Sequence, residues 1–186
     1  MATQLDLQEQ EQLDAIKAFW NQYGNLITWL LVLLLGAFAA WNGWNWWQRD
    51  QGVKASAMYD ALEQAAQAGD VDKTARVFGD LKERFPRTAF AQQGALTAAR
   101  VQFDKGQLDA AKASLTWAAD SGTEDELRTI ARLRLAGMLV EAKQYDEALK
   151  QLDAAKTAGF EGLVADRRGD VLAAARRKDE ANAAYQ

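Results

Sequence analysis

The chain has 186 residues, of which 49% are hydrophobic and 26% charged, and its formal net charge is −4. It contains no His and no Cys, which excludes disulfides and thiol catalysis and removes the commonest metal ligands and the commonest general base. An acidic chain without a basic patch also argues against nucleic-acid binding, which needs clustered Lys and Arg to neutralise phosphates.

Residues 1–25 form an acidic N-terminal segment in which four carboxylates outnumber the single Lys17. Leu13, Ile16 and Trp20 recur at the spacing of one helical face. The segment is therefore either a short helix lying on a membrane surface or a disordered acidic tail, and the sequence favours neither.

Residues 26–47 contain no charge, and a helix of these 22 residues would be about 33 Å long, close to the roughly 30 Å hydrocarbon core of a bilayer. Residues 28–41 are apolar on every face except for Thr28, whereas a core helix of a soluble domain should carry a polar stripe. Ala37-Phe38-Ala39 has the small-x-small form of a signal cleavage site, but no basic segment stands directly before the apolar run. We therefore predict an uncleaved transmembrane anchor, with a buried core helix and a cleaved signal as the alternatives.

Aromatic residues crowd both ends of this run, as expected where amphipathic rings lie at the two membrane interfaces. The predicted interface residues are Trp20 and Tyr23 before the run and Trp41, Trp44, Trp46 and Trp47 at its far end. Core packing is the alternative for such a cluster, although Trp44, Trp46 and Trp47 cannot all face one way on a helix.

The positive-inside rule gives only a weak prediction of orientation. It counts Lys17 on one side of the anchor against Arg49 and Lys54 on the other. Taken alone, this count places the C-terminal side in the cytoplasm.

Residues 48–186 are predicted to be nearly all helix, because Pro86 is the single proline and Ala, Leu, Glu, Gln, Lys and Arg dominate. An aspartate recurs at spacings of 37, 37 and 33 residues, which is within the range of helical-repeat arrays. A small residue stands ten positions before each of the last three aspartates, and a large residue stands six positions after all four. The aspartates are Asp72, Asp109, Asp146 and Asp179; the small residues before the last three are Ala99, Ala136 and Gly169; the large residues after all four are Phe78, Leu115, Leu152 and Tyr185.

Each unit is interpreted as helix, tight turn and helix, with the aspartate capping the second helix. The pattern resembles the tetratricopeptide repeat, with units near 56–85, 89–120, 126–158 and 160–186. The departures are Leu62 in place of a small residue, Thr74 in place of alanine, and a terminal proline only at Pro86. The alternative is an alanine-rich helical bundle. The last unit stops after barely two turns of its second helix, so we expect native residues to be missing beyond it.

A solenoid of this kind presents a concave face to partners. Offsets from each aspartate predict that Leu96, Arg100, Phe103, Ile130, Leu133 and Val140 line this face, and a slip of one residue would place them in the core instead. The acidic run Glu124-Asp125-Glu126 is interpreted as the capped, dipole-matched start of a helix from Leu127 rather than as a catalytic cluster.

Taken together, the acidic segment, the single anchor and the four-unit domain resemble the YfgM-like family of bacterial inner-membrane proteins over the whole chain. The resemblance implies an ancillary subunit of the Sec translocon that crosses the inner membrane once, with its N-terminus in the cytoplasm and its repeats in the periplasm. It implies Sec translocon subunits, periplasmic chaperones and translocated client proteins as partners, and no cofactor, nucleic acid or small-molecule substrate. This orientation opposes the charge count, but a long domain can cross largely regardless of flanking charge.

Two rival functions remain open at this point. The first is a structural scaffold that tethers one folded partner in a cell-envelope complex, and it differs from a chaperone role by tight binding of a single protein. The second is an enzyme with carboxylate chemistry, which would need a deep pocket with convergent acids of raised pKa.

Overall fold

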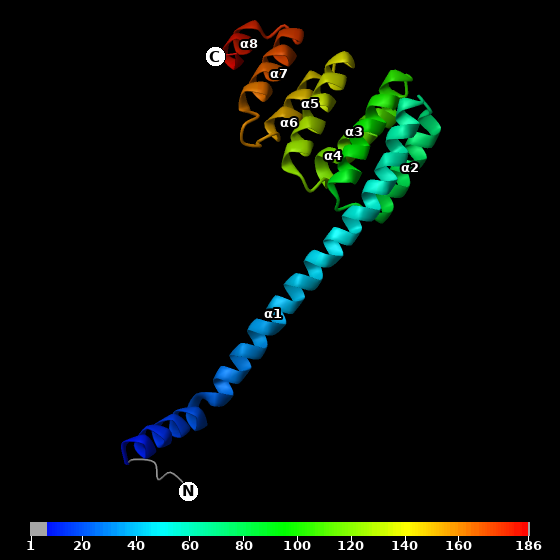
Figure 1. Cartoon of the computed structure of the whole chain (residues 1–186). Coiled ribbons are helices and arrows are strands. Elements are labelled where there is room, and N and C mark those ends of the chain that lie inside the picture. Colours follow the sequence, from blue (N-terminus) through cyan, green and yellow to red (C-terminus); the bar gives the residue numbers. More distant parts are fainter. Residues whose placement is uncertain (1–6, 186) are drawn as a thin grey trace. The chain divides into compact units, whose positions relative to one another are not determined.

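The computed structural model describes residues 7–185, and these contain eight α-helices and no strand. In chain order (Figure 1) the helices are α1 (Leu7–Gln67), α2 (Val71–Arg84), α3 (Ala89–Asp104), α4 (Leu108–Ser121), α5 (Asp125–Glu141), α6 (Tyr145–Asp153), α7 (Glu161–Ala174) and α8 (Lys178–Ala184). The all-α prediction is therefore confirmed. Pro86 interrupts none of them, because it follows Phe85, the C-terminal cap of α2. The chain divides into two compact units, with the boundary inside α1 between Arg49 and Asp50.

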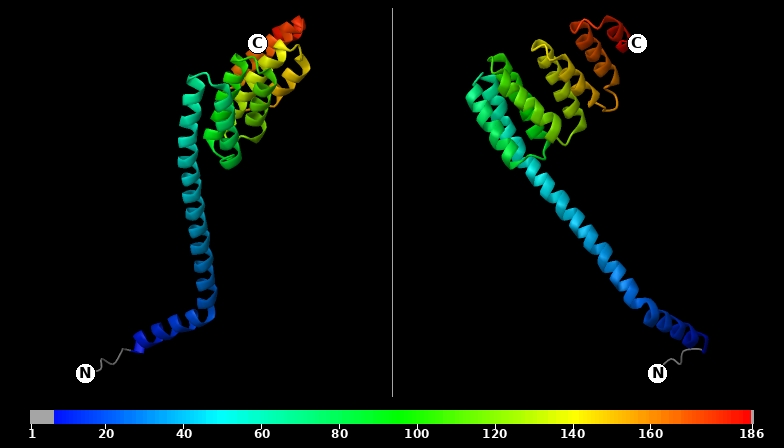
Figure 2. Two further views of the ribbon diagram at one scale, coloured as in Figure 1. Left: turned by 90° about the vertical axis from the view of Figure 1, so that its right-hand side faces the viewer. Right: turned by 180° about the vertical axis from the view of Figure 1, so that it is seen from behind.

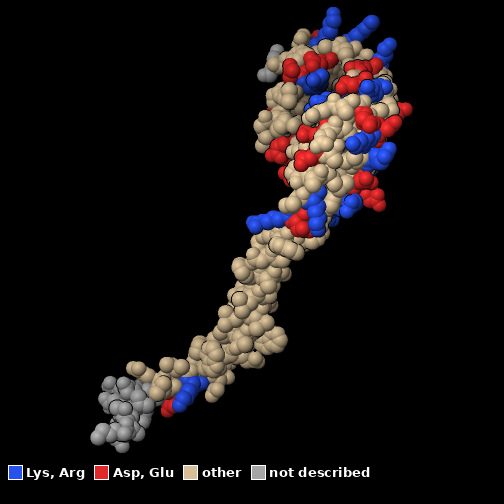
Figure 3. Space-filling model, turned by 45° about the vertical axis from the view of Figure 1, so that its right-hand side comes forward, with Lys and Arg blue, Asp and Glu red and all other residues tan. Residues whose placement is uncertain are grey.

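The first unit contains the uncharged stretch of α1. Within the described residues, α1 is the one helix long and apolar enough to cross a membrane. Its leucines from Leu30 to Leu35 are all more than half exposed, as expected of side chains that lipid surrounds. Figure 3 shows this stretch without any Lys, Arg, Asp or Glu side chain. These observations support a membrane-associated protein.

The N-terminal segment before the anchor is only partly described. Helix α1 begins at Leu7, so residues 7–25 are helical, and Leu13 and Ile16 are exposed on it. The first six residues of the predicted acidic segment lie outside the described residues. The placement of this helix on a membrane surface stays a prediction.

The second unit is a stack of helix pairs. Each helix from α2 to α8 packs against the next one in the chain, and α3, α5 and α7 also pack in succession (Figures 1 and 2). The last turns of α1 join this unit through Ala55 and Leu62, which belong to one continuous apolar core with residues of α2 to α8. This order of contacts is that of a repeat solenoid, in which each pair buries its apolar face against its neighbours.

One turn geometry recurs between the two helices of all four pairs. Three residues before each repeated aspartate the backbone has a positive φ, at Gly69 (65°), Gly106 (74°), Lys143 (57°) and Arg176 (63°). The residue after it donates its N–H to a carbonyl five positions back, as in the bonds Asp70 to Ala65, Gln107 to Gln102, Gln144 to Leu139 and Arg177 to Leu172, at 2.8–3.0 Å. These are Schellman turns, which end the first helix and begin the second.

The prediction that the repeated aspartates cap the second helices is wrong. The N-cap positions are held by Asp70, Gln107, Gln144 and Arg177, and of these only Asp70 accepts a backbone N–H through its side chain, from Lys73 at 3.0 Å. The Schellman turn starts each helix one residue before the aspartate. The aspartate then lies in the first turn, where its charge interacts favourably with the positive end of the helix dipole. Helix α5 likewise begins at Asp125, and its N-cap Glu124 makes no side-chain cap.

The two departures in the first repeat have local explanations. Leu62 is fully buried, and the space it needs comes from Gly94 on α3, where an added Cβ would lie 3.3 Å from Leu62 Cδ1 and 2.9 Å from Leu81 Cδ2. In the first repeat the small residue of this helix contact is therefore Gly94 on the facing helix α3. Thr74 is also fully buried, and its hydroxyl donates to the carbonyl of Asp70 at 2.7 Å, which satisfies the added polar group.

Candidate functional site

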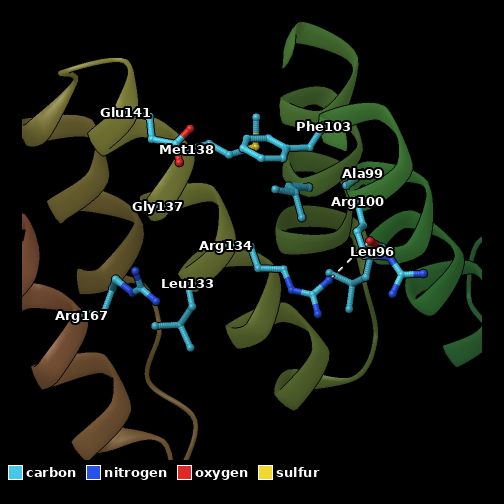
Figure 4. A pocket seen from close by; sticks show the side chains of 11 residues that line it. Leu96, Ala99, Arg100, Phe103, Leu133, Arg134, Gly137, Met138, Glu141 and Arg167 are labelled. Atoms are coloured by element: carbon cyan, nitrogen blue, oxygen red, sulfur yellow. Dashed lines mark hydrogen bonds between the residues drawn. The ribbon is translucent and has the colours of Figure 1, made fainter. Parts of the chain in front are cut away.

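The candidate site is an open pocket of about 310 Å³ in the second unit. The first helices of three successive pairs, α3, α5 and α7, supply most of it. Its apolar lining is Leu96, Ala99, Phe103, Leu115, Leu133, Gly137 and Met138, and its charged lining is Arg100, Arg134, Glu141 and Arg167. Figure 4 shows these side chains, with Arg167 entering from the side opposite α3.

The pocket contains four of the six residues predicted for the concave face. Leu96, Arg100, Phe103 and Leu133 line it. Ile130 and Val140 do not line it; both are half-buried and pack against the apolar core. The part of all six residues in partner binding stays a prediction.

Sequence reasoning missed Arg134, Met138, Glu141 and Arg167. Successive residues on a helix are rotated by about 100°, so a one-residue error in the alignment turns a side chain from the cavity to its edge. A usable signal was present, since arginine recurs at positions 100, 134 and 167, at spacings of 34 and 33 residues. Arg134 and Arg167 stand at the same offset, twelve residues before Asp146 and Asp179.

The guanidinium groups are held at the margin of the pocket. Arg134 Nη1 donates to the carbonyl of Leu96, and the two atoms are 3.4 Å apart, so this bond is weak. Gly137 leaves space beside Arg167, because a Cβ there would lie 3.9 Å from Arg167 Nη1. Arg100, Arg134 and Arg167 are all exposed, so each keeps contact with solvent while bordering an apolar floor.

An aromatic pair extends the partly exposed surface beside α3. The rings of Tyr59 and Phe90 are 5.8 Å apart, and the Tyr59 hydroxyl donates to Glu63 Oε1 at 3.2 Å. Burial raises the pKa of Tyr59 above its ordinary value of 10.0, and the negative charge of Glu63 raises it further, while a hydrogen bond with Thr97 and the charge of Arg100 oppose the shift.

The chemistry of the pocket suits recognition. In the part of the chain that the structure covers, no three His, Cys, Asp or Glu side chains form a group able to hold a metal ion. The pocket offers three guanidinium groups, one carboxylate and an apolar floor. Such a set can bind an apolar side chain and an anion, and it presents no nucleophile beside a base.

The chain matches known proteins over nearly its whole length. A family model described as a tetratricopeptide repeat-like domain matches residues 17–186. A protein of Escherichia coli (strain K12) named "Ancillary SecYEG translocon subunit" is 32% identical over 181 residues, which cover 96% of this chain and 85% of that protein.

Two further relatives carry the same name. The one from Neisseria gonorrhoeae is 31% identical over 94% of this chain and 84% of its own length. The one from Haemophilus influenzae is 28% identical over 90% of this chain and 82% of its own length. No solved structure shows a significant match. These similarities confirm the resemblance drawn from the repeats and the anchor.

Proposed function

Because this chain belongs to the tetratricopeptide repeat-like family of ancillary SecYEG translocon subunits, we propose that it is a membrane-tethered, non-catalytic protein-interaction subunit of a SecYEG translocon. One combination carries this proposal. The same chain contains a helix whose uncharged stretch is long enough to cross a bilayer and a helical-repeat unit with an open, mostly apolar pocket.

The proposed mechanism is tethering. A single span confines the repeat unit to the membrane, so any partner near the translocon meets it at a raised effective concentration. Weak contacts then suffice for repeated capture and release. No reaction is required, in keeping with a pocket whose polar groups are guanidiniums and one carboxylate.

We place the N-terminus in the cytoplasm and the repeat unit in the periplasm of a bacterial inner membrane, and we propose that it assists periplasmic chaperones with translocated proteins. The support is the family resemblance, since the count of Lys17 against Arg49 and Lys54 points the other way. The difference of one cation is small beside the ability of a long domain to cross regardless of flanking charge.

Protease accessibility in spheroplasts tests this orientation. Protease added to intact spheroplasts should digest the repeat unit and leave a membrane-protected N-terminal fragment. Digestion of the repeat unit only after lysis would place it in the cytoplasm. The periplasmic role would then have to be replaced by a cytoplasmic scaffold that holds a single folded partner.

A further inference from the structure

Three arginines gather at one pocket of an otherwise acidic chain. Arg100, Arg134 and Arg167 come from three different helices, α3, α5 and α7, and Glu141 is the one acid that lines the pocket with them. The lining therefore carries a net positive charge, while the whole chain has a formal charge of −4. This local sign is opposite to the overall balance and favours an anionic ligand.

The arginines of this unit fall into two groups. Arg128, Arg132, Arg168 and Arg177 each form an ion pair with an acid of the chain. Arg76, Arg84, Arg87 and Arg176 form none with any of residues 12–185, and the three pocket arginines belong with them. No ion pair within 4.0 Å involves Arg100, Arg134 or Arg167 across residues 12–185, and the hydrogen bond from Arg134 to Leu96 is a long one. Their guanidinium groups thus keep donors available for a carboxylate, which arginine can bind through two parallel hydrogen bonds.

The floor between the arginines is apolar and adaptable. Leu96 and Leu133 are almost fully buried, whereas Phe103 and Met138 are partly exposed. An entering apolar side chain would therefore contact two fixed leucines and a flexible methionine that can adapt to it. The volume of about 310 Å³ lies at the lower limit of pockets that hold small ligands, about 300 Å³. It suits one or two side chains of a polypeptide.

We propose that this pocket binds an acidic, amphipathic segment of a partner polypeptide, with an apolar side chain on the floor and carboxylates on Arg100, Arg134 and Arg167. This inference rests on the proposed function, because it names the chemistry of the partner that the repeat unit would capture. Three guanidiniums on three different helices can bind several carboxylates along one segment, so the Asp and Glu side chains of that segment are the source.

Binding of dye-labelled peptides to the full chain in nanodiscs, measured by fluorescence anisotropy, tests the proposal. The first peptide alternates Leu and Phe with Glu and has both ends blocked. The others replace Glu with Gln, replace Glu with Lys, or replace Glu with Gln and leave the C-terminal carboxylate free. We expect the Glu peptide to bind about tenfold more tightly than the blocked Gln peptide. Tight binding of the free-ended Gln peptide alone would assign the chain end as the ligand and overturn the proposal.

Arg134→Gln and Arg167→Gln should each weaken binding of the Glu peptide by about three- to tenfold. Together they should abolish the preference for the Glu peptide over the Gln peptide. Arg76→Gln, an exposed arginine on α2, is the control and should leave binding unchanged. Equal binding of the Glu, Gln and Lys peptides, or insensitivity to both pocket substitutions, would overturn the proposal. If this occurred while the chain still co-purified with SecYEG, the proposed function would stand without this ligand. If co-purification were lost while peptide binding stayed intact, the assigned ligand would stand and the proposed function would not.

Discussion

The side chain of Gln92 is hydrogen-bonded to both the N–H and the carbonyl of Glu124. Gln92 Oε1 accepts the Glu124 N–H at 3.0 Å, while Nε2 donates to the Glu124 carbonyl at 3.1 Å and to that of Ala118 at 3.2 Å. Gly122 makes room for the amide, since a Cβ there would clash with it. A fully buried side chain of α3 thereby fixes the connection from α4 to α5, and with it the start of a helix that lines the pocket.

Substitution Gln92→Leu should destabilise the repeat unit by about 1–3 kcal/mol, because buried backbone groups of the connection lose their partners. Urea unfolding of the full chain in detergent, followed by far-UV circular dichroism, measures the change. Gln93→Leu at the half-buried neighbouring position is the matched control, with an expected effect within about 0.5 kcal/mol. Equal stability of the two variants would show that the Gln92 bonds contribute little.

The Schellman turns predict a stabilising substitution. Lys143 has a φ of 57°, which costs a residue with a Cβ about 1–2 kcal/mol relative to glycine, and two of the four equivalent positions already hold glycine. Lys143→Gly should therefore stabilise the chain by about 0.5–1 kcal/mol after the extra chain entropy of glycine is deducted. Lys105→Gly, at a φ of −95°, lacks this gain and should be neutral or destabilising in the same unfolding assay. A loss of stability in both variants would contradict the turn geometry.

The raised pKa of Tyr59 predicts a pH dependence at alkaline pH. Its phenol ionises at a lower pH in the unfolded chain than in the folded one, so its contribution is complete below pH 10 and is lost as the pH rises through the folded pKa. Wild-type chain should lose more stability than Tyr59→Phe over that window, since ionisation of the other tyrosines and the lysines is common to both. Parallel curves of unfolding free energy against pH for the two proteins would refute this assignment.

The tryptophans after the span should lie at headgroup depth. In a variant with Trp46 as the single tryptophan and phenylalanine at the others, lipids brominated near the headgroup should quench fluorescence more than lipids brominated near the chain ends. The control is Leu35→Trp in a chain without other tryptophans, since residue 35 lies near the middle of the uncharged run and should show the reverse order. Stronger quenching of Trp46 by the lipids brominated near the chain ends would show that this cluster does not lie at the interface.

The repeat could be found from the sequence because it is a matter of spacing. The regular spacing of four aspartates and of the small residues before them indicates helix pairs, and a one-residue error in the alignment does not hide this spacing. The residues of the pocket are harder to predict, because Met138 lines the cavity while Val140, two positions later on α5, does not. That Gly94 provides the space for Leu62 could not be predicted either, since the two positions are 32 residues apart on different helices.

Co-purification from native membranes tests the central claim most directly. The affinity-tagged full chain is expressed in its host, the membranes are dissolved in a mild detergent, and the SecY that elutes with the chain is quantified by mass spectrometry. A second tagged single-span protein of equal abundance serves as the control. The account predicts SecYEG enriched well above that control, with the enrichment lost when residues 26–47 are deleted. SecYEG at the control level in the wild-type eluate would contradict it.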